Sequence, residues 1–178
     1  MDKTRQFEAM MLAHLDAAYN LARWLLRDEQ NAQDVVQDAY LRGFKYFDSF
    51  RGSDARPWIL GIVRNACFSW LEKNRQADRA LAFDEERDID IVDGHSPVAR
   101  SPEESLIRKL EQARIDQAID GLPPAFREVI ILREMEEMSY EQISQVAGIP
   151  VGTVMSRLAR ARALLRRALA ESEGKEQE

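Results

Sequence analysis

The stretch SYEQISQVAGIPVGTVMSRLARARALLRR, residues 139–167, has the pattern of two amphipathic helices joined by a tight turn. Ser139 can cap the first helix, and Gln142, three residues later, completes a capping box. Gly148 tolerates the positive φ of a helix end, and Pro150 can restart the chain at the beginning of the next helix. The sequence therefore predicts a helix-turn-helix.

The second helix of this pair carries arginine without any acid between residues 151 and 170, although the whole chain has a formal net charge of −6. Its apolar residues recur at the spacing of one buried helical face, at Val154, Leu158, Ala161, Leu165 and Ala168. A helix-turn-helix presents the start of its second helix to the major groove, where small polar side chains and arginine reach base edges. The pattern favours DNA binding over the alternative, a solvated basic helix in a bundle.

Length and composition limit the remaining choices. With 178 residues the chain has room for one ordinary domain or two small ones, and 45% hydrophobic residues suffice for packed cores. No apolar run is long enough for a membrane span, and the N-terminus lacks a signal-peptide core, so we expect a cytoplasmic protein without membrane insertion. Cys67 is the sole cysteine, and His14 and His95 are far apart in sequence, so we expect no internal disulfide, metal or cofactor.

Helical periodicity also runs through the N-terminal part. A first helix is predicted from Phe7 to Leu26, with one apolar face made of Met11, Leu15, Ala18, Ala22 and Leu25. Asn31 is expected to cap a second helix that buries Val36, Tyr40, Phe44 and Phe47. The other face of that helix holds Asp34, Gln37, Asp38 and Arg42, which is solvated surface unless a partner docks there.

A third helix is predicted to open at Pro57 and to bury Ile59, Ile62, Val63, Ala66 and Trp70. Aromatic residues gather in this part of the chain beside several arginines and lysines. Most of these rings are expected to form core, although aromatic rings beside basic side chains also suit single-stranded nucleic acid.

The periodicity fails between residues 78 and 100, where seven acids face three arginines, a local net charge of −4. Helical order resumes with Ser101 as a cap and Pro102 as the first helical residue, and Leu106, Leu110 and Ala113 are expected to form the apolar face. A further helix, residues 126–135, should buttress the helix-turn-helix. The predicted fold is all-α, with two small helical domains joined by a flexible acidic linker.

Taken in order, these segments resemble the extracytoplasmic-function group of bacterial sigma factors. AQDVVQDAYLRGF resembles the helix that binds the clamp helices of the largest polymerase subunit, and FDSFRG with PWILGIVRNACFSWL resembles the segment that reads and melts the minus-ten element. The stretch from Leu122 to Arg166 resembles the minus-thirty-five recognition domain. The resemblance implies residues 1–77 as a region 2-like domain, 78–101 as linker, 102–172 as a region 4-like domain and 173–178 as a polar tail.

The resemblance also implies three sets of contact residues. Major-groove contacts at the minus-thirty-five element are expected from Thr153, Met155, Ser156, Arg157, Ala159 and Arg160. Contacts to the minus-ten single strand are expected from Phe50, Arg51, Ser53, Asp54, Arg56, Arg64, Asn65, Lys73 and Arg75. Polymerase contacts are expected from Asp34, Val35, Gln37, Asp38 and Leu41. Met155 departs from the family pattern, because that position often carries Lys or Arg.

The expected partners are core RNA polymerase, through the clamp helices of its largest subunit and the flap of the second, promoter DNA, and an anti-sigma factor. The alternative function is a self-standing helix-turn-helix regulator, which would bind duplex DNA tightly without polymerase. An enzyme is not expected, because the chain has no phosphate-binding glycine loop, no metal-ligand spacing and no nucleophile elbow, and no catalytic residue is assigned.

Overall fold

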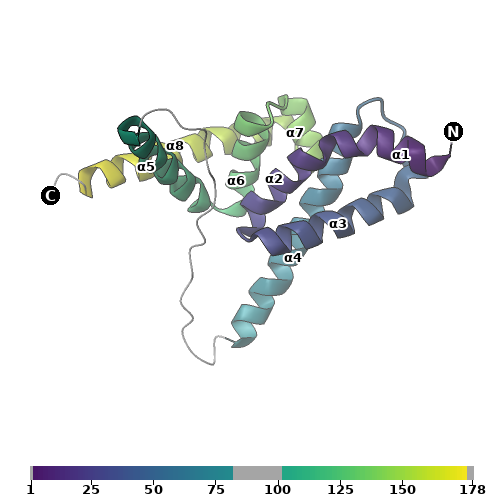
Figure 1. Cartoon of the computed structure of the whole chain (residues 1–178), viewed down its shortest axis with the longest axis horizontal. Coiled ribbons are helices and arrows are strands. Elements are labelled where there is room, and N and C mark those ends of the chain that lie inside the picture. The colour runs from purple at the N-terminus through teal and green to yellow at the C-terminus, as the bar shows by residue number, and fades with distance from the viewer. Residues whose placement is uncertain (1, 82–101, 176–178) are drawn as a thin grey trace.

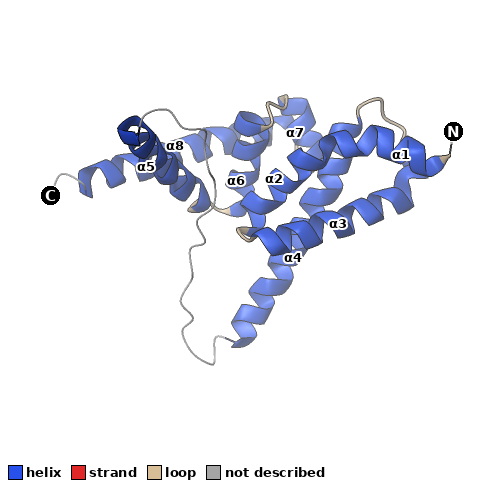
Figure 2. Ribbon diagram, viewed as in Figure 1, coloured by secondary structure: helices blue, strands red, loops and turns tan. Residues whose placement is uncertain are grey.

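The computed structural model describes residues 2–81 and 102–175, and their regular secondary structure is entirely helical (Figures 1 and 2). The elements in chain order are α1 (Lys3–Met11), η1 (Leu12–His14), α2 (Leu15–Leu26), α3 (Glu29–Tyr46), η2 (Phe47–Ser49), α4 (Ala55–Leu81), α5 (Pro102–Asp120), α6 (Pro124–Ile130), η3 (Ile131–Met135), α7 (Tyr140–Ala147) and α8 (Val151–Lys175). The predicted all-α class is confirmed. The predicted linker lies outside the described residues from position 82 to 101.

The N-terminal unit is a bundle in which α2 packs against α3 and α4. The single helix predicted over residues 7–26 is wrong, because the 3₁₀ turn η1 separates α1 from α2. A 3₁₀ turn contains fewer residues than a turn of α-helix. Residues after η1 therefore point in other directions than a continuous helix would give them. As a result Leu15 is 39% exposed, whereas Met11, Ala18 and Leu25 are buried as predicted.

The cap of α3 also differs from the prediction. Arg27 ends α2 in the left-handed conformation, with φ 59°, and Asp28 then takes the extended conformation of an N-cap. The Asp28 carboxylate accepts a hydrogen bond from the backbone N–H of Asn31 at 2.7 Å. Asn31, predicted as the cap, is therefore the third residue of the helix.

Helix α4 begins at Ala55, two residues before Pro57, and continues to Leu81, inside the segment predicted as linker. Ile59 and Val63 are fully buried, as predicted, while Ile62, Ala66 and Trp70 are half-buried. These half-buried side chains lie at the edge of the core. One side of α4 is therefore partly exposed to solvent.

The C-terminal unit is formed by α6, α7 and α8, with α5 crossing α8 (Figure 1). Its core contains Val129, Ile131, Leu132, Met138, Ile143, Val154 and Leu158. Between α6 and α7 the chain makes a π-helical turn, η3. The predicted buried face of α5 is wrong: Leu106 and Leu110 are each 58% exposed, and Ala113 is exposed, because α5 buries only its end, at Ile119.

The two units lie directly against each other, with α4 against α7 and α2 against α6. The Arg127 guanidinium of α6 donates to the carbonyls of Trp24 and Leu25, at 2.7 and 3.2 Å, and so satisfies acceptors that the end of α2 leaves open. A Cβ atom added at Gly61 would lie 3.7 Å from the carbonyl oxygen of Val146, which shows how closely α4 approaches α7. This contact brings together residues far apart in the sequence.

Candidate nucleic-acid interface

Local geometry fixes the angle between α7 and α8. The Ser139 hydroxyl accepts from the Gln142 backbone N–H at 3.1 Å, and the Gln142 side-chain oxygen accepts from the Ser139 N–H at 3.0 Å, which confirms the capping box. Gly148 ends α7 with φ 66°, and no atom lies within 4 Å of the Cβ it lacks. Backbone conformation rather than space therefore requires the glycine. The carbonyl of Pro150 accepts from Thr153 and Val154, which starts α8.

Helix α8 buries its apolar stripe and exposes most of the predicted base-reading residues. Val154, Leu158 and Ala161 are buried, as predicted, whereas Leu165 and Ala168 of the predicted stripe are only half-buried. On the other side, Met155, Ser156, Ala159 and Arg160 are exposed and Thr153 is half-buried. Arg157 differs from these residues, because its guanidinium lies 4.0 Å from the fully buried carboxylate of Glu128 on α6.

A shallow, open hollow lies along α4. It is lined by Arg64, Asn65, Phe68, Ser69, Glu72, Lys73 and Gln76. Three of these belong to the predicted minus-ten set, and the other four do not. Those four follow Asn65 at helical spacings of three, four, seven and eleven, so they lie on the same side of α4. The ring of Phe68 lies 4.0 Å from the Arg64 guanidinium, as a cation–π contact.

The loop before α4 holds four more residues of the predicted minus-ten set. The half-buried ring of Phe50 packs between Phe47, at 6.3 Å, and Trp58, at 5.1 Å. Arg51 donates to the backbone carbonyl of Asp48, and Ser53 is exposed. Asp54 accepts a hydrogen bond from Gln142 of α7 at 2.8 Å. None of these four residues lines the hollow on α4.

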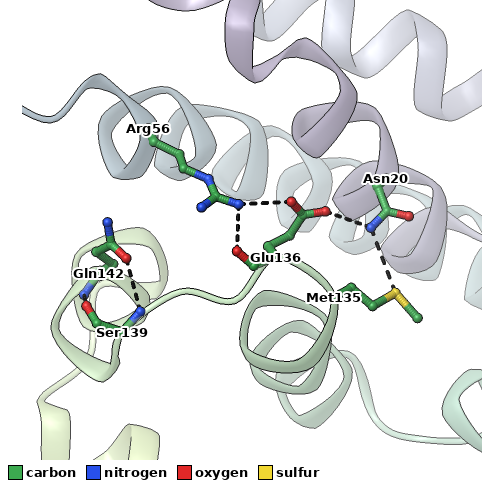
Figure 3. A network of polar contacts seen from close by, with 6 residues as sticks. All are labelled: Asn20, Arg56, Met135, Glu136, Ser139 and Gln142. Carbon is green, nitrogen blue, oxygen red and sulfur yellow. Dashed lines mark hydrogen bonds and ion pairs between the residues drawn. The ribbon is translucent and has the colours of Figure 1, made fainter.

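Two arginines of the minus-ten set are held by acids of the C-terminal unit, which sequence reasoning missed. Arg64 donates from Nε and Nη2 to the two carboxylate oxygens of Glu128, at 2.7 and 3.0 Å. Arg56 donates to the Glu136 carboxylate at 3.0 Å and to its backbone carbonyl at 2.7 Å (Figure 3). The second carboxylate oxygen of Glu136 accepts from Asn20 at 2.8 Å.

Glu128 is the most unusual charge of the described residues, because its side chain is fully buried. Burial raises the pKa of Glu128 above its ordinary value, and the hydrogen bonds and charge of Arg64, together with Arg157, act in the opposite direction. A buried carboxylate is costly unless it is paired and hydrogen-bonded. The bidentate contact with Arg64 meets both conditions.

Comparison with known proteins assigns the family. The sequence matches the description "Sigma-70 region 2" over residues 10–77 and "Sigma-70, region 4" over residues 112–165. It is 32% identical to RNA polymerase sigma-H factor of Pseudomonas aeruginosa, over 93% of this chain and 86% of that protein. The chain belongs to the sigma-70 family, in its extracytoplasmic-function group. The sigma factor is also 34% identical to the ECF RNA polymerase sigma-E factor of Escherichia coli K12, over 72% of this chain and 69% of that protein.

Solved structures support the same assignment. The sigma factor RpoE of Bartonella quintana, solved with the anti-sigma factor NepR, is 27% identical and has a TM-score of 0.75, covering 93% of this chain and 98% of that one. CnrH, solved with the cytosolic domain of CnrY, is 26% identical with a TM-score of 0.63, covering 94% and 90%. The chain is thus an alternative sigma factor with two helical domains, and these relatives give no support to a self-standing regulator.

The sigma factor exposes most of its predicted polymerase-binding residues on one face of α3. Asp34, Gln37 and Asp38 are exposed, and Leu41 is 64% exposed, which is large for a leucine. Val35 differs from these residues, because it lies in the core at 7% exposure. Helical geometry explains its burial, because Val35 precedes Ala39 by four residues on the buried side of α3.

The described residues contain no group of three or more His, Cys, Asp or Glu side chains arranged to hold a metal ion. Among the same residues, no helix is both long and apolar enough to cross a membrane. Sigma factors are transcription regulators rather than enzymes.

Proposed function

We propose that this sigma factor binds core RNA polymerase, directs it to specific promoters and helps to separate the DNA strands. The observation that carries the proposal is the exposed start of α8, an acid-free stretch with Met155, Ser156 and Arg160 at its surface. Small polar and arginine side chains at that position of a helix-turn-helix suit base edges in the major groove. In this proposal α8 reads the minus-thirty-five element.

The hollow on α4 is the proposed site for a base of the minus-ten single strand. Asn65 offers amide donors and acceptors at its rim, and Phe68 offers a ring for stacking. Removing a base from the duplex costs about a few kcal/mol, which such contacts must offset. Lys73 and Arg75 are exposed farther along α4 and suit phosphate groups of the same strand.

Polymerase docking is proposed for the exposed face of α3, which carries Leu41 and, earlier in the helix, Asp34, Gln37 and Asp38. An apolar residue beside polar groups is a common arrangement at a protein interface. The clamp helices of the largest subunit are the proposed partner there, and the flap of the second subunit is the proposed partner of the C-terminal unit.

An anti-sigma factor is a further proposed partner, supported by the related sigma factor RpoE, which was solved with the anti-sigma factor NepR. Because promoter DNA and RNA polymerase are in the bacterial cytoplasm, we propose the same location for this chain.

Run-off transcription with purified core polymerase tests the proposal on pooled promoter fragments. Transcripts should appear only when both core polymerase and the sigma factor are present. The variant Leu41→Ala should weaken binding to core polymerase and transcription while leaving the fold intact, since the side chain is 64% exposed. The matched control is Leu12→Ala, which removes a leucine of 51% exposure outside the proposed surface.

The contrary result is tight, sequence-specific binding of duplex DNA by the chain alone, with no transcripts when core polymerase is added. That result would favour the self-standing regulator.

A further inference from the structure

In the contact between the two units, a pair of acids faces a pair of arginines. Arg56 and Arg64 stand eight residues apart on α4, about two turns, so they share one face of the helix. Glu128 of α6 and Glu136, after η3, meet that face from the C-terminal unit. Each guanidinium therefore has a carboxylate from the other unit within 3.0 Å.

The arginines in these pairs are among those proposed to hold DNA. Arg56 and Arg64 belong to the minus-ten set, and Arg157, from the recognition helix, also approaches Glu128 at 4.0 Å. Guanidinium groups bind carboxylate and phosphate with the same planar, bidentate geometry. Glu128 and Glu136 therefore occupy donor atoms that DNA phosphates would need.

Neighbouring contacts strengthen this arrangement. Asn20 of α2 donates to Glu136, whose side chain is only 13% exposed, and Figure 3 shows Arg56 and Asn20 approaching the same carboxylate. Asp54, another member of the minus-ten set, accepts from Gln142 of α7. In contrast, Asn65 remains exposed on α4, so the contact covers one part of the minus-ten surface and leaves another part open.

We propose that Glu128 and Glu136 act as internal substitutes for DNA phosphates, which hold the free sigma factor in a closed state. The closed state and binding of the minus-ten strand then compete for Arg56 and Arg64. This inference rests on the proposed function, because it assigns regulation to the same DNA-binding surface. Removing either acid should shift the equilibrium towards the open state. By linkage, the same change should raise the affinity of the protein for single-stranded DNA.

The experiment compares full-length Glu136→Gln and Glu128→Gln with the control Glu134→Gln. The control makes the same charge change two residues from Glu136, but its carboxylate pairs with Arg162 inside the C-terminal unit. Affinity is measured with a short fluorescent single-stranded DNA of mixed sequence. Opening is measured as the distance distribution between spin labels at Thr4→Cys and Glu171→Cys, two exposed positions in different units.

We expect Glu136→Gln and Glu128→Gln each to raise DNA affinity by about fivefold or more and to broaden the distance distribution, with Glu134→Gln unchanged in both. The idea is overturned if Glu136→Gln folds normally and changes neither quantity, or if the control raises affinity equally. Glu136 decides the matter if Glu128→Gln does not fold. Run-off transcription separates the two proposals. If the sigma factor yields transcripts but the acid variants do not open, only the closed state is refuted. If the variants open but no transcripts appear, only the sigma function is refuted.

Discussion

Replacing Arg64 by methionine should cost more stability than replacing its partner Glu128 by glutamine. Glu128 is fully buried, so Arg64→Met leaves its charge with only Arg157, 4.0 Å away. Removing one partner of a buried ion pair costs about 3–5 kcal/mol in the free energy of unfolding. Glu128→Gln keeps the side-chain shape and leaves an arginine that is 18% exposed and lies over Phe68, so its cost should be about 1.5–3 kcal/mol.

The cost of Arg64→Met should also depend on pH. Burial raises the pKa of Glu128, and loss of the Arg64 hydrogen bonds removes the main opposing influence, so the pKa rises further. A carboxyl group with a raised pKa binds its proton more tightly in the folded than in the unfolded chain. Its destabilising effect is therefore full above the folded pKa and declines as the pH falls towards the ordinary value of 4.5.

Urea unfolding followed by circular dichroism at neutral and mildly acidic pH measures both effects. Arg64→Met should lose less stability at the acidic pH than at the neutral one, because protonation removes the unpaired buried charge of Glu128. The reasoning fails if Arg64→Met is no more costly than Glu128→Gln at neutral pH, or if its cost is the same at both pH values.

Three further outcomes are expected. Gly148→Ala should lower the free energy of unfolding by about 1–2 kcal/mol, since a Cβ is disfavoured at φ 66°, and Gly148→Asn should cost less because asparagine tolerates this conformation better. Burial raises the pKa of Cys67 to about 12, so the thiol should resist alkylation in the folded chain and react after unfolding; rapid alkylation of the folded chain would contradict this. Arg160→Ala should weaken transcription from promoters with a minus-thirty-five element and leave the melting temperature unchanged, because the side chain is exposed; a lowered melting temperature would indicate a structural role instead.

The elements that the sequence predicted correctly depend on neighbours in the chain. The capping box at Ser139, the left-handed Gly148 and the buried stripe of α8 all involve residues within a few positions of each other. Local rules for helix capping and periodicity apply at that range. The exposed polar face of α3 follows from the same periodicity.

The wrong or missing predictions have a different origin. Whether Leu106 of α5 is buried depends on which helix lies beside it, and periodicity alone does not supply that neighbour. The partners of Arg56 and Arg64 are 80 and 64 positions away in the chain, so no spacing rule reaches them. The prediction of Asn31 as the cap failed for a smaller reason, because Asp28, three residues earlier, is also of a type that caps well.

The positions of the two acids have a consequence for how such a protein can change. Glu128 and Glu136 lie outside every set of residues predicted to touch DNA or polymerase, whereas Arg56 and Arg64 belong to such a set. Mutation of either acid can therefore change the equilibrium between the closed and open states without altering the contacts that the protein makes to bases or phosphates. Mutation of either arginine changes both properties together. Under selection, the threshold for activation and the choice of promoter can then evolve through separate substitutions.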